Sequence, residues 1–179
     1  MNIAIMAGGP SSERTISLQT AENISNKKKK KKHNVYLIDI LDSKWIYNSD
    51  NKSYQINKHD FSLQLNSKTI VFDYAVIAIH GKMGEDGILQ AYFEMQDIPY
   101  SSPDVLASAL TYDKIKCKQF LSSFNIPMAK QYLLSRGEAI NADEIIESLG
   151  LPGGHAAVRG RPPALRPAGP PGSPGTGPA

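Results

Sequence analysis

A glycine-rich stretch at residues 80–87, His-Gly-Lys-Met-Gly-Glu-Asp-Gly, limits the folds that this chain can adopt more than any other segment. It follows an apolar run at residues 74–79, which is typical of a buried strand, and precedes a helix-like pattern at residues 88–95. In open α/β sheets, ligands bind where strands end and helices begin, because free backbone N–H groups converge there. The plainer interpretation is a structural turn, in which glycines set the geometry and Asp86 caps the helix.

Strands and helices are predicted to alternate along most of the chain, which indicates an α/β fold. A strand, a helix and a second strand at the start form a unit whose parallel strands need a right-handed crossover. The polar residues 43–69 predict a hairpin or an irregular excursion. The expected strands are residues 2–7, 35–40, 70–79, 98–101 and 128–134, and the expected helices are residues 13–31, 86–97, 103–110, 113–124 and 142–149.

Capping residues support two of these helices. Thr111 or Asp113 can begin the helix over residues 113–124, and Asn141 can begin the last helix, which Gly150 ends.

Two segments depart from this order. Residues 27–32 are six consecutive lysines, and without them the formal charge of +3 becomes −3. Helix periodicity places Lys28 and Lys31 on the apolar stripe, where only snorkelling stems would suit them. We interpret the run as a solvated charge patch; the alternative is a nucleic-acid-binding arm, although no aromatic residues accompany it. No specific nucleic-acid partner is therefore expected.

The second departure is the tail, residues 153–179, which holds seven of the 12 prolines and seven of the 14 glycines. It cannot bury enough apolar surface to fold, so we expect it to be disordered. Its composition also contrasts with the Lys-, Asn- and Ile-rich body, which suggests an out-of-frame or foreign origin.

The cysteine content and the lengths of the apolar stretches indicate where in the cell the protein is expected. The single cysteine, Cys117, excludes an internal disulfide framework and a cysteine-based zinc site. No stretch is long enough to span a membrane, and the N-terminus lacks the pattern of a signal peptide. A cytoplasmic location without a membrane partner is expected.

The loop at residues 8–13, Gly-Gly-Pro-Ser-Ser-Glu, offers a second set of polar groups. Its spacing is neither a P-loop nor the dinucleotide fingerprint, and Ser12 can be a simple helix cap. Glu13 favours the helix dipole, or it can bind the ammonium group of a small zwitterion. Glu13 and His80 both follow parallel strands, so they can share one crevice.

Further side chains suggest roles around that crevice. His80 can donate a hydrogen bond to a carboxylate or phosphate, or transfer a proton. Glu85 and Asp86 can hold their loop by accepting backbone N–H bonds, and Gln90 can reach back to it. Lys114 points to water, or it contacts a nucleotide phosphate under a second domain.

Taken together, these elements resemble the N-terminal part of the D-alanine–D-alanine ligase family, which are ATP-grasp enzymes of peptidoglycan synthesis. The most specific string is His-Gly-x-x-Gly-Glu-Asp-Gly-x-x-Gln at residues 80–90, and the matching pieces cover residues 1–152 in family order. The other pieces are residues 7–14 with Ser17, residues 99–103, residues 107–110, Asp113-Lys114 with Lys118, residues 126–127 and residues 149–152.

The resemblance implies a fold and a reaction. The fold is a Rossmann-like three-layer domain at residues 1–97, a partial ATP-grasp domain at residues 98–152 and the tail at residues 153–179. In the reaction, ATP phosphorylates a first D-alanine, and the amine of a second D-alanine attacks the acyl phosphate. Magnesium or manganese is implied as the metal, with cell-wall biogenesis and cell shape as the setting, and a homodimer is expected.

The resemblance also implies roles for individual residues. Glu13 and His80 would be catalytic, with Glu13 on the ammonium of the first D-alanine and His80 beside its carboxylate and the developing phosphate. Lys114 would contact ATP. Ser12 and Ser17 would line the substrate site and organise its loop. The remaining motif residues, which would organise the second loop, are Gly81, Gly84, Glu85, Asp86, Gly87 and Gln90.

The chain departs from the family pattern after residue 152, where the tail replaces an apolar strand that carries an ATP-binding lysine. No metal ligand is therefore assigned to this chain, and we expect it to be a truncated ligase without activity. The alternatives are a non-catalytic fragment that binds a D-amino acid and a non-specific basic nucleic-acid binder. The choice among D-alanine, D-lactate and D-serine as second substrate lies with residues outside the match.

Overall fold

The computed structural model describes residues 1–135, 137–150 and 155–159. The chain divides into two compact units, Met1–Asn125 and Ile126–Ala179. The domain boundaries that the sequence predicts, after residues 97 and 152, stay predictions.

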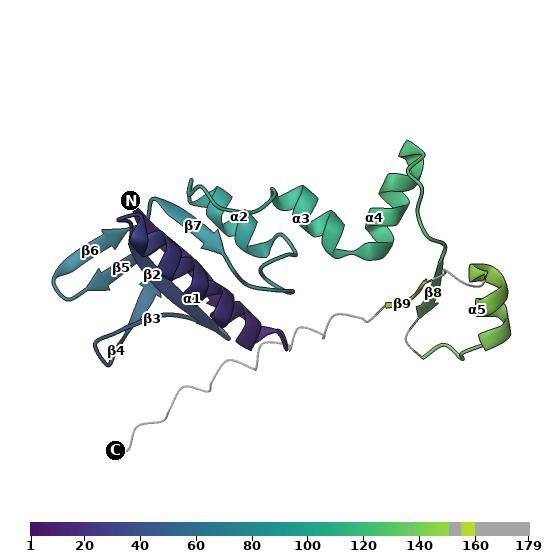
Figure 1. The fold of residues 1–179 in the computed structure, drawn as a ribbon, viewed down its shortest axis with the longest axis horizontal. Coiled ribbons are helices and arrows are strands. Elements are labelled where there is room, and N and C mark those ends of the chain that lie inside the picture. Colours follow the sequence, from purple (N-terminus) through teal and green to yellow (C-terminus); the bar gives the residue numbers. More distant parts are fainter. Residues whose placement is uncertain (136, 151–154, 160–179) are drawn as a thin grey trace, which may run out of the picture. The chain divides into compact units, whose positions relative to one another are not determined.

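A seven-stranded mixed sheet forms the centre of the first unit, in the order β6-β5-β4-β3-β2-β1-β7 (Figure 1). β1 is parallel to both of its neighbours, β2 and β7, whereas the pairs from β2 to β6 are antiparallel. The strands are β1 (Asn2–Gly8), β2 (Asn34–Leu41), β3 (Lys44–Ser49), β4 (Lys52–Asn57), β5 (Ser62–Leu65), β6 (Lys68–Val71) and β7 (Tyr74–Ile77).

The predicted strand–helix–strand unit at the start of the chain is confirmed. Helix α1 (Arg14–Lys30) connects β1 to the parallel strand β2, in which Asn34 lies opposite Asn2 and Ile40 lies opposite Gly8. The carboxyl ends of β1, β2 and β7 therefore meet at one edge of the sheet.

The polar segment at residues 43–69 is more regular than the sequence predicted, because it forms four antiparallel strands, β3 to β6. The few apolar residues of this segment are enough to pack these strands into the core, since Trp45, Phe61 and Leu63 are all buried. The single strand that was predicted over residues 70–79 is in fact two, β6 and β7, separated by Phe72 and Asp73. These strands lie at opposite ends of the strand order, so the sheet curls to bring them near each other.

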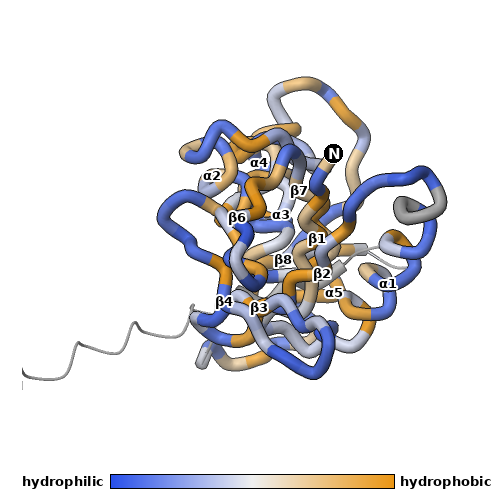
Figure 2. The backbone as a smooth tube through the Cα atoms, turned by 90° about the vertical axis from the view of Figure 1, so that its left-hand side faces the viewer, coloured by the Kyte–Doolittle hydropathy of each residue, from blue (hydrophilic) through white to orange (hydrophobic). Residues whose placement is uncertain are grey.

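Hydrophobic side chains cover both faces of this sheet, which confirms the three-layer arrangement. On one face α1 contributes Ala21 to a core with Ile5 and Val76. On the other, α2 (Ile88–Met95) contributes Leu89 and Phe93 to a larger core inside the curl. Figure 2 shows hydrophobic residues in orange along the central strands.

Short helices complete the first unit, and Asp113, rather than Thr111, caps one of them. The Asp113 carboxylate accepts hydrogen bonds from the backbone N–H groups of Ile115 and Lys116, 3.0 Å each. The helices are α3 (Val105–Tyr112), α4 (Lys114–Leu121) and the 3-10 turn η1 (Ser122–Phe124). In place of the strand predicted at residues 98–101, a single bridge pairs Ala75 with Tyr100.

The second unit contains β8 (Gln131–Ser135), α5 (Ala142–Leu149) and β9 (His155–Arg159). The expected cap and stop of α5 are confirmed: Asn141 accepts from the Glu144 N–H, and Gly150 follows its last residue. β9 pairs in parallel with β8, so the structure differs from the expected disorder over these five residues. The rest of the predicted tail lies outside the described residues.

Candidate active site

Two loops meet at the carboxyl edge of the parallel strands. The Ser11 hydroxyl donates to the His80 carbonyl oxygen (2.9 Å) and accepts from the Glu13 N–H (3.2 Å). A Cβ built on Gly81 would lie 3.8 Å from Glu13 Oε2, so the Glu13 carboxylate is adjacent to the second loop. Glu13 and His80 are therefore neighbours across 67 residues of sequence, as their positions after parallel strands predicted.

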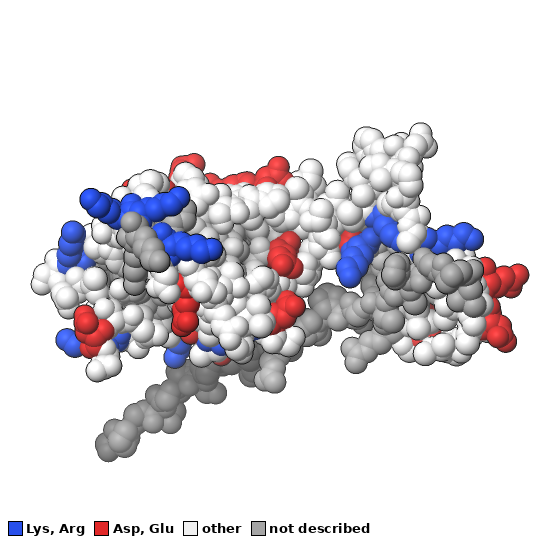
Figure 3. All heavy atoms as spheres, viewed as in Figure 1, with Lys and Arg blue, Asp and Glu red and all other residues white. Residues whose placement is uncertain are grey.

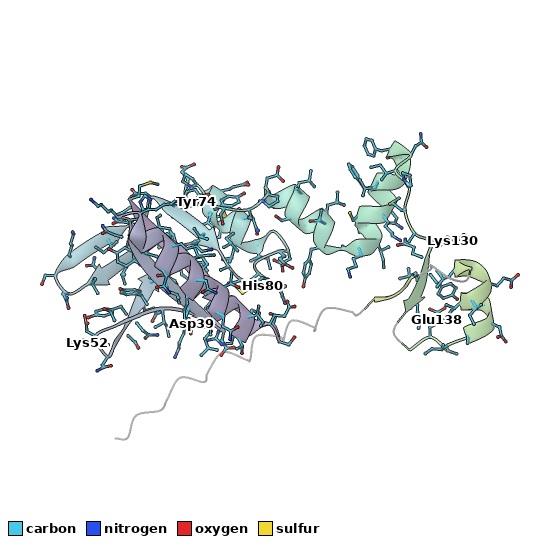
Figure 4. The ribbon with its side chains drawn as sticks, in the orientation of Figure 1. Asp39, Lys52, Tyr74, His80, Lys130 and Glu138 are labelled. Carbon is cyan, nitrogen blue, oxygen red and sulfur yellow. The ribbon has the colours of Figure 1, made fainter. Side chains whose placement is uncertain are left out.

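His80 lies just beyond the carboxyl end of β7, where Figure 4 labels it. Its Nδ1 is 3.9 Å from Glu85 Oε1, an ion pair only when the histidine is protonated. Its Nε2 is buried and has no hydrogen-bond partner among the described residues. The side chain as a whole is partly exposed (38%), so a ligand can reach the open part of the ring but not Nε2 in this conformation.

The loop over residues 80–87 is held mainly by its own backbone and by α2. Glu85 N–H donates to the Gly81 carbonyl (2.9 Å), and the buried Gln90 side chain donates from Nε2 to the Gly84 carbonyl (2.8 Å). Gln90 thus makes the contact with the loop that the sequence suggested.

The two acidic residues of the loop have different surroundings. Asp86 Oδ1 accepts from the Ile88 N–H (3.2 Å), as expected, but the N-cap of α2 is Gly87 in a left-handed conformation (φ 90°). Asp86 is therefore not the N-cap itself. The Glu85 side chain faces His80, and it accepts no backbone N–H bond from the described residues.

The two serines assigned with the substrate site lie in different environments. Ser17 is fully buried; its hydroxyl accepts from the Gly8 N–H (2.9 Å) and donates to the Ala78 carbonyl (2.8 Å). It therefore joins the ends of β1 and β7, which supports the loop-organising role. The Ser12 side chain is exposed. The residue that links the loops is the neighbouring Ser11, which the sequence did not single out.

An ion pair that the sequence did not reveal anchors the first loop to β2. Arg14 Nη2 lies 2.8 and 2.7 Å from the two carboxylate oxygens of Asp39, and Nη1 donates to the Ile40 carbonyl (2.8 Å). Both side chains are less than one-third exposed. Figure 4 labels Asp39 beneath α1, at the same end of the sheet as His80. No sequence signal joins two charged residues that are 25 positions apart.

Beside this edge lies a cavity of about 370 Å³, to which Lys114 contributes. Burial raises the pKa of the Tyr112 phenol in its wall, and nearby carboxylates raise it further. Those carboxylates are Asp86, Glu85 and Glu13. Tyr112 and Lys114 thus lie beside the acidic part of the site. The cavity is lined by Gly84, Glu85, Gln90, Ser102, Pro103, Ser108, Thr111, Tyr112 and Lys114.

The charges around the site are mixed, and in Figure 3 both signs occur on the viewed face of the first unit. Lys27, Lys31 and Lys32 have exposed side chains; those of residues 28–30 lie outside the described set. Within the described part of the chain, no group of three His, Cys, Asp or Glu side chains is placed to hold a metal ion. Nor does any helix described here have the length and hydrophobicity needed to cross a membrane.

Comparison with known proteins identifies the family of this chain. Residues 2–103 match the family model described as D-ala D-ala ligase N-terminus. The D-alanine–D-alanine ligase of Bacteroides fragilis is 41% identical over 152 residues, which are 84% of this chain and 47% of that protein. The enzyme of Parabacteroides distasonis is 43% identical over 152 residues, 84% of this chain and 46% of its own length.

Solved structures give the same result. The D-alanine–D-alanine ligase of Aeromonas hydrophila superposes with a TM-score of 0.68 at 26% identity, over 83% of this chain and 55% of that one. The Bacillus anthracis enzyme complexed with ATP gives 0.57 at 27% identity, over 82% of this chain and 44% of that one. The chain spans about half the length of the curated relatives that it matches. The chain belongs to the D-alanine–D-alanine ligase family, whose N-terminal region it matches.

Proposed function

We propose that this chain supplies the first-substrate site of an ATP-dependent D-alanine–D-alanine ligase. The observation that carries the proposal is the junction of the Glu13 and His80 loops through Ser11. It brings a carboxylate and an imidazole together at the sheet edge where α/β proteins bind ligands.

The two side chains suit the two ends of an amino-acid zwitterion. The exposed Glu13 carboxylate, just before α1, attracts the ammonium group of D-alanine. His80, whose side chain is partly exposed beside Glu85, hydrogen-bonds the carboxylate of D-alanine and then the acyl phosphate that replaces it. Both groups thereby orient the carboxylate toward the incoming phosphate.

The neighbouring cavity supports a place for the nucleotide. Lys114 is exposed on its wall, where an ammonium group can neutralise a phosphate of ATP. The ligase of Bacillus anthracis, a structural relative, has been solved in complex with ATP. Magnesium supplies charge neutralisation in phosphoryl transfer, but the described residues contain no cluster of three metal ligands, so the proposal includes no step through it.

The proposal extends to the complete ligase reaction. A ligase with this site joins two D-alanines for peptidoglycan, in the cytoplasm and as a homodimer. The chain spans about half of its relatives' length, and the sequence predicts that these 179 residues bind without turnover.

The test is calorimetric titration of the chain with D-alanine, with L-alanine and with ATP. We expect saturable binding of D-alanine that the variant Glu13→Gln weakens about 10- to 100-fold, because a charged hydrogen bond contributes about 1.5–3 kcal/mol. The matched control is Glu22→Gln, which removes an exposed carboxylate farther along α1 and should leave the affinity unchanged.

Equal losses in the two variants, or no D-alanine binding by the unmodified chain, would contradict the proposed site. Phosphate release that depends on both ATP and D-alanine would contradict the expectation of binding without turnover.

A further inference from the structure

We infer that Arg14 and Asp39 form a clamp that positions Glu13 for substrate, so that Arg14 is a positioning residue of the site. The inference rests on the proposed function, because it takes the role of Glu13 from there. The Arg14–Asp39 clamp is defined by the Asp39 carboxylate, the Arg14 guanidinium and the Ile40 carbonyl.

The planar Arg14 guanidinium donates hydrogen bonds to two different acceptors. Nη2 contacts both oxygens of Asp39, and Nη1 donates to the Ile40 carbonyl. A lysine has a single nitrogen and cannot reproduce this planar arrangement. The start of α1 is thus attached to the carboxyl end of β2, the neighbouring strand.

Glu13 lies between this clamp and a second attachment. On one side, the Ser11 hydroxyl accepts from the Glu13 N–H and donates to the His80 carbonyl. On the other side, the Ser17 N–H donates to the Glu13 carbonyl (3.0 Å), and the Arg14 N–H donates to the Ser11 carbonyl (3.2 Å). The exposed Glu13 carboxylate has no hydrogen-bond or ion-pair partner among the described residues, so its position depends on the backbone that these contacts hold.

Gly8 provides the space that the clamp requires. It has a φ of 85°, and a Cβ at this position would collide with the Arg14 guanidinium and the Asp39 carboxylate. The next residue completes the attachment, since the Gly9 N–H donates to the Ile40 carbonyl (2.9 Å). The glycine at position 8 therefore serves the clamp directly.

A positioning clamp and a purely stabilising ion pair should affect different properties of the protein. Loss of a stabilising ion pair lowers the unfolding free energy of the whole unit. Loss of a positioning clamp instead lowers the local order of residues 11–17 and the affinity of the site for D-alanine. Two variants weaken the clamp with little change in size: Asp39→Asn and Arg14→Lys. The matched control is Asp73→Asn, because Asp73 accepts from the Asn2 N–H (2.7 Å) at the opposite end of β1.

The test combines amide hydrogen exchange with D-alanine titration of the full 179-residue chain. In both clamp variants we expect exchange in residues 11–17 to become about 10-fold faster, and D-alanine affinity to fall about 10-fold. Exchange in residues 52–65, which form β4, β5 and the turn between them, should stay the same. The Asp73→Asn control should change neither the exchange of residues 11–17 nor the affinity.

Equal acceleration in residues 11–17 and 52–65 would overturn the inference, because it would show only a loss of global stability. Unchanged exchange in residues 11–17 would overturn it as well. Absence of D-alanine binding in the unmodified chain would refute the proposed function instead, and the exchange comparison would still decide whether the clamp orders the loop.

Discussion

Single glycines in the two loops make room for atoms of the protein itself. At Gly84 an added Cβ would collide with the backbone carbonyl of Ile79, which a rotamer change cannot move. At Gly8 it would collide with the Arg14 guanidinium. At both positions the close neighbour of the glycine is therefore a group of the protein itself.

Replacement of Gly84 by alanine should therefore destabilise the first unit. We expect Gly84→Ala to lower the free energy of unfolding by about 3 kcal/mol, because overpacking against backbone is poorly relieved. The comparison is Gly81→Ala in the same loop, where the added Cβ would meet its nearest neighbour at 3.4 Å. That variant should cost only about 1–2 kcal/mol, from its positive φ. Urea denaturation measures both, and a smaller loss in Gly84→Ala would contradict the packing argument.

At the scale of elements, α2 joins the candidate site to the antiparallel strands. Its Gln90 holds the Gly84 carbonyl, while its other end reaches the turn between β4 and β5. There the Tyr92 hydroxyl donates to the Lys58 carbonyl (2.8 Å), and Gln96 Nε2 donates to the His59 carbonyl (3.1 Å). The strands of residues 43–69 thus support the helix that orders the motif loop.

The Tyr92 contact predicts a pH dependence at the alkaline end. Burial, followed by the charge of Asp60, raises the pKa of Tyr92 from 10.0 to about 12. Because the folded-state pKa is raised, the contribution is complete below about pH 10 and is lost as the pH rises toward 12. The unfolding free energy should therefore fall more steeply over this range in the unmodified chain than in Tyr92→Phe. Urea unfolding at pH 8, 10 and 11 measures the difference, and identical slopes would show that Tyr92 titrates normally.

At the scale of the whole molecule, the candidate site is contained in the first unit. Both hydrophobic cores and the cavity with Lys114 lie within Met1–Asn125. No described residue of the second unit is needed for the contacts that join Glu13, His80 and Arg14.

A chain that ends at Asn125 should therefore fold and bind D-alanine with an affinity within about twofold of the full chain, since its cores remain complete. Calorimetry of the two chains, together with their circular dichroism, checks this. The control is the same shortened chain with Glu13→Gln, which should again lose affinity. A folded but non-binding chain of residues 1–125 would show that the second unit contributes to the site.

Much of this architecture could be predicted from sequence, because it depends on local patterns. Apolar runs located β1 and β2, and Asn141 and Gly150 located the ends of α5. The excursion at residues 43–69 could not be predicted in detail, since its few apolar side chains gain burial only when the sheet curls. The break at Phe72 and Asp73 arises in the same way, from the pairing of Asp73 with Asn2 across the curl.

Residue types at fixed spacings were enough to predict the α/β class and the family, because neither depends on side-chain contacts. The contacts between side chains, in contrast, depend on how the chain folds. The tertiary structure placed Ser11, rather than Ser12, between the loops, buried Ser17 and paired Arg14 with Asp39. Such contacts depend on strand register and on the curl of the sheet, which bring together side chains that are 25 to 69 residues apart in sequence.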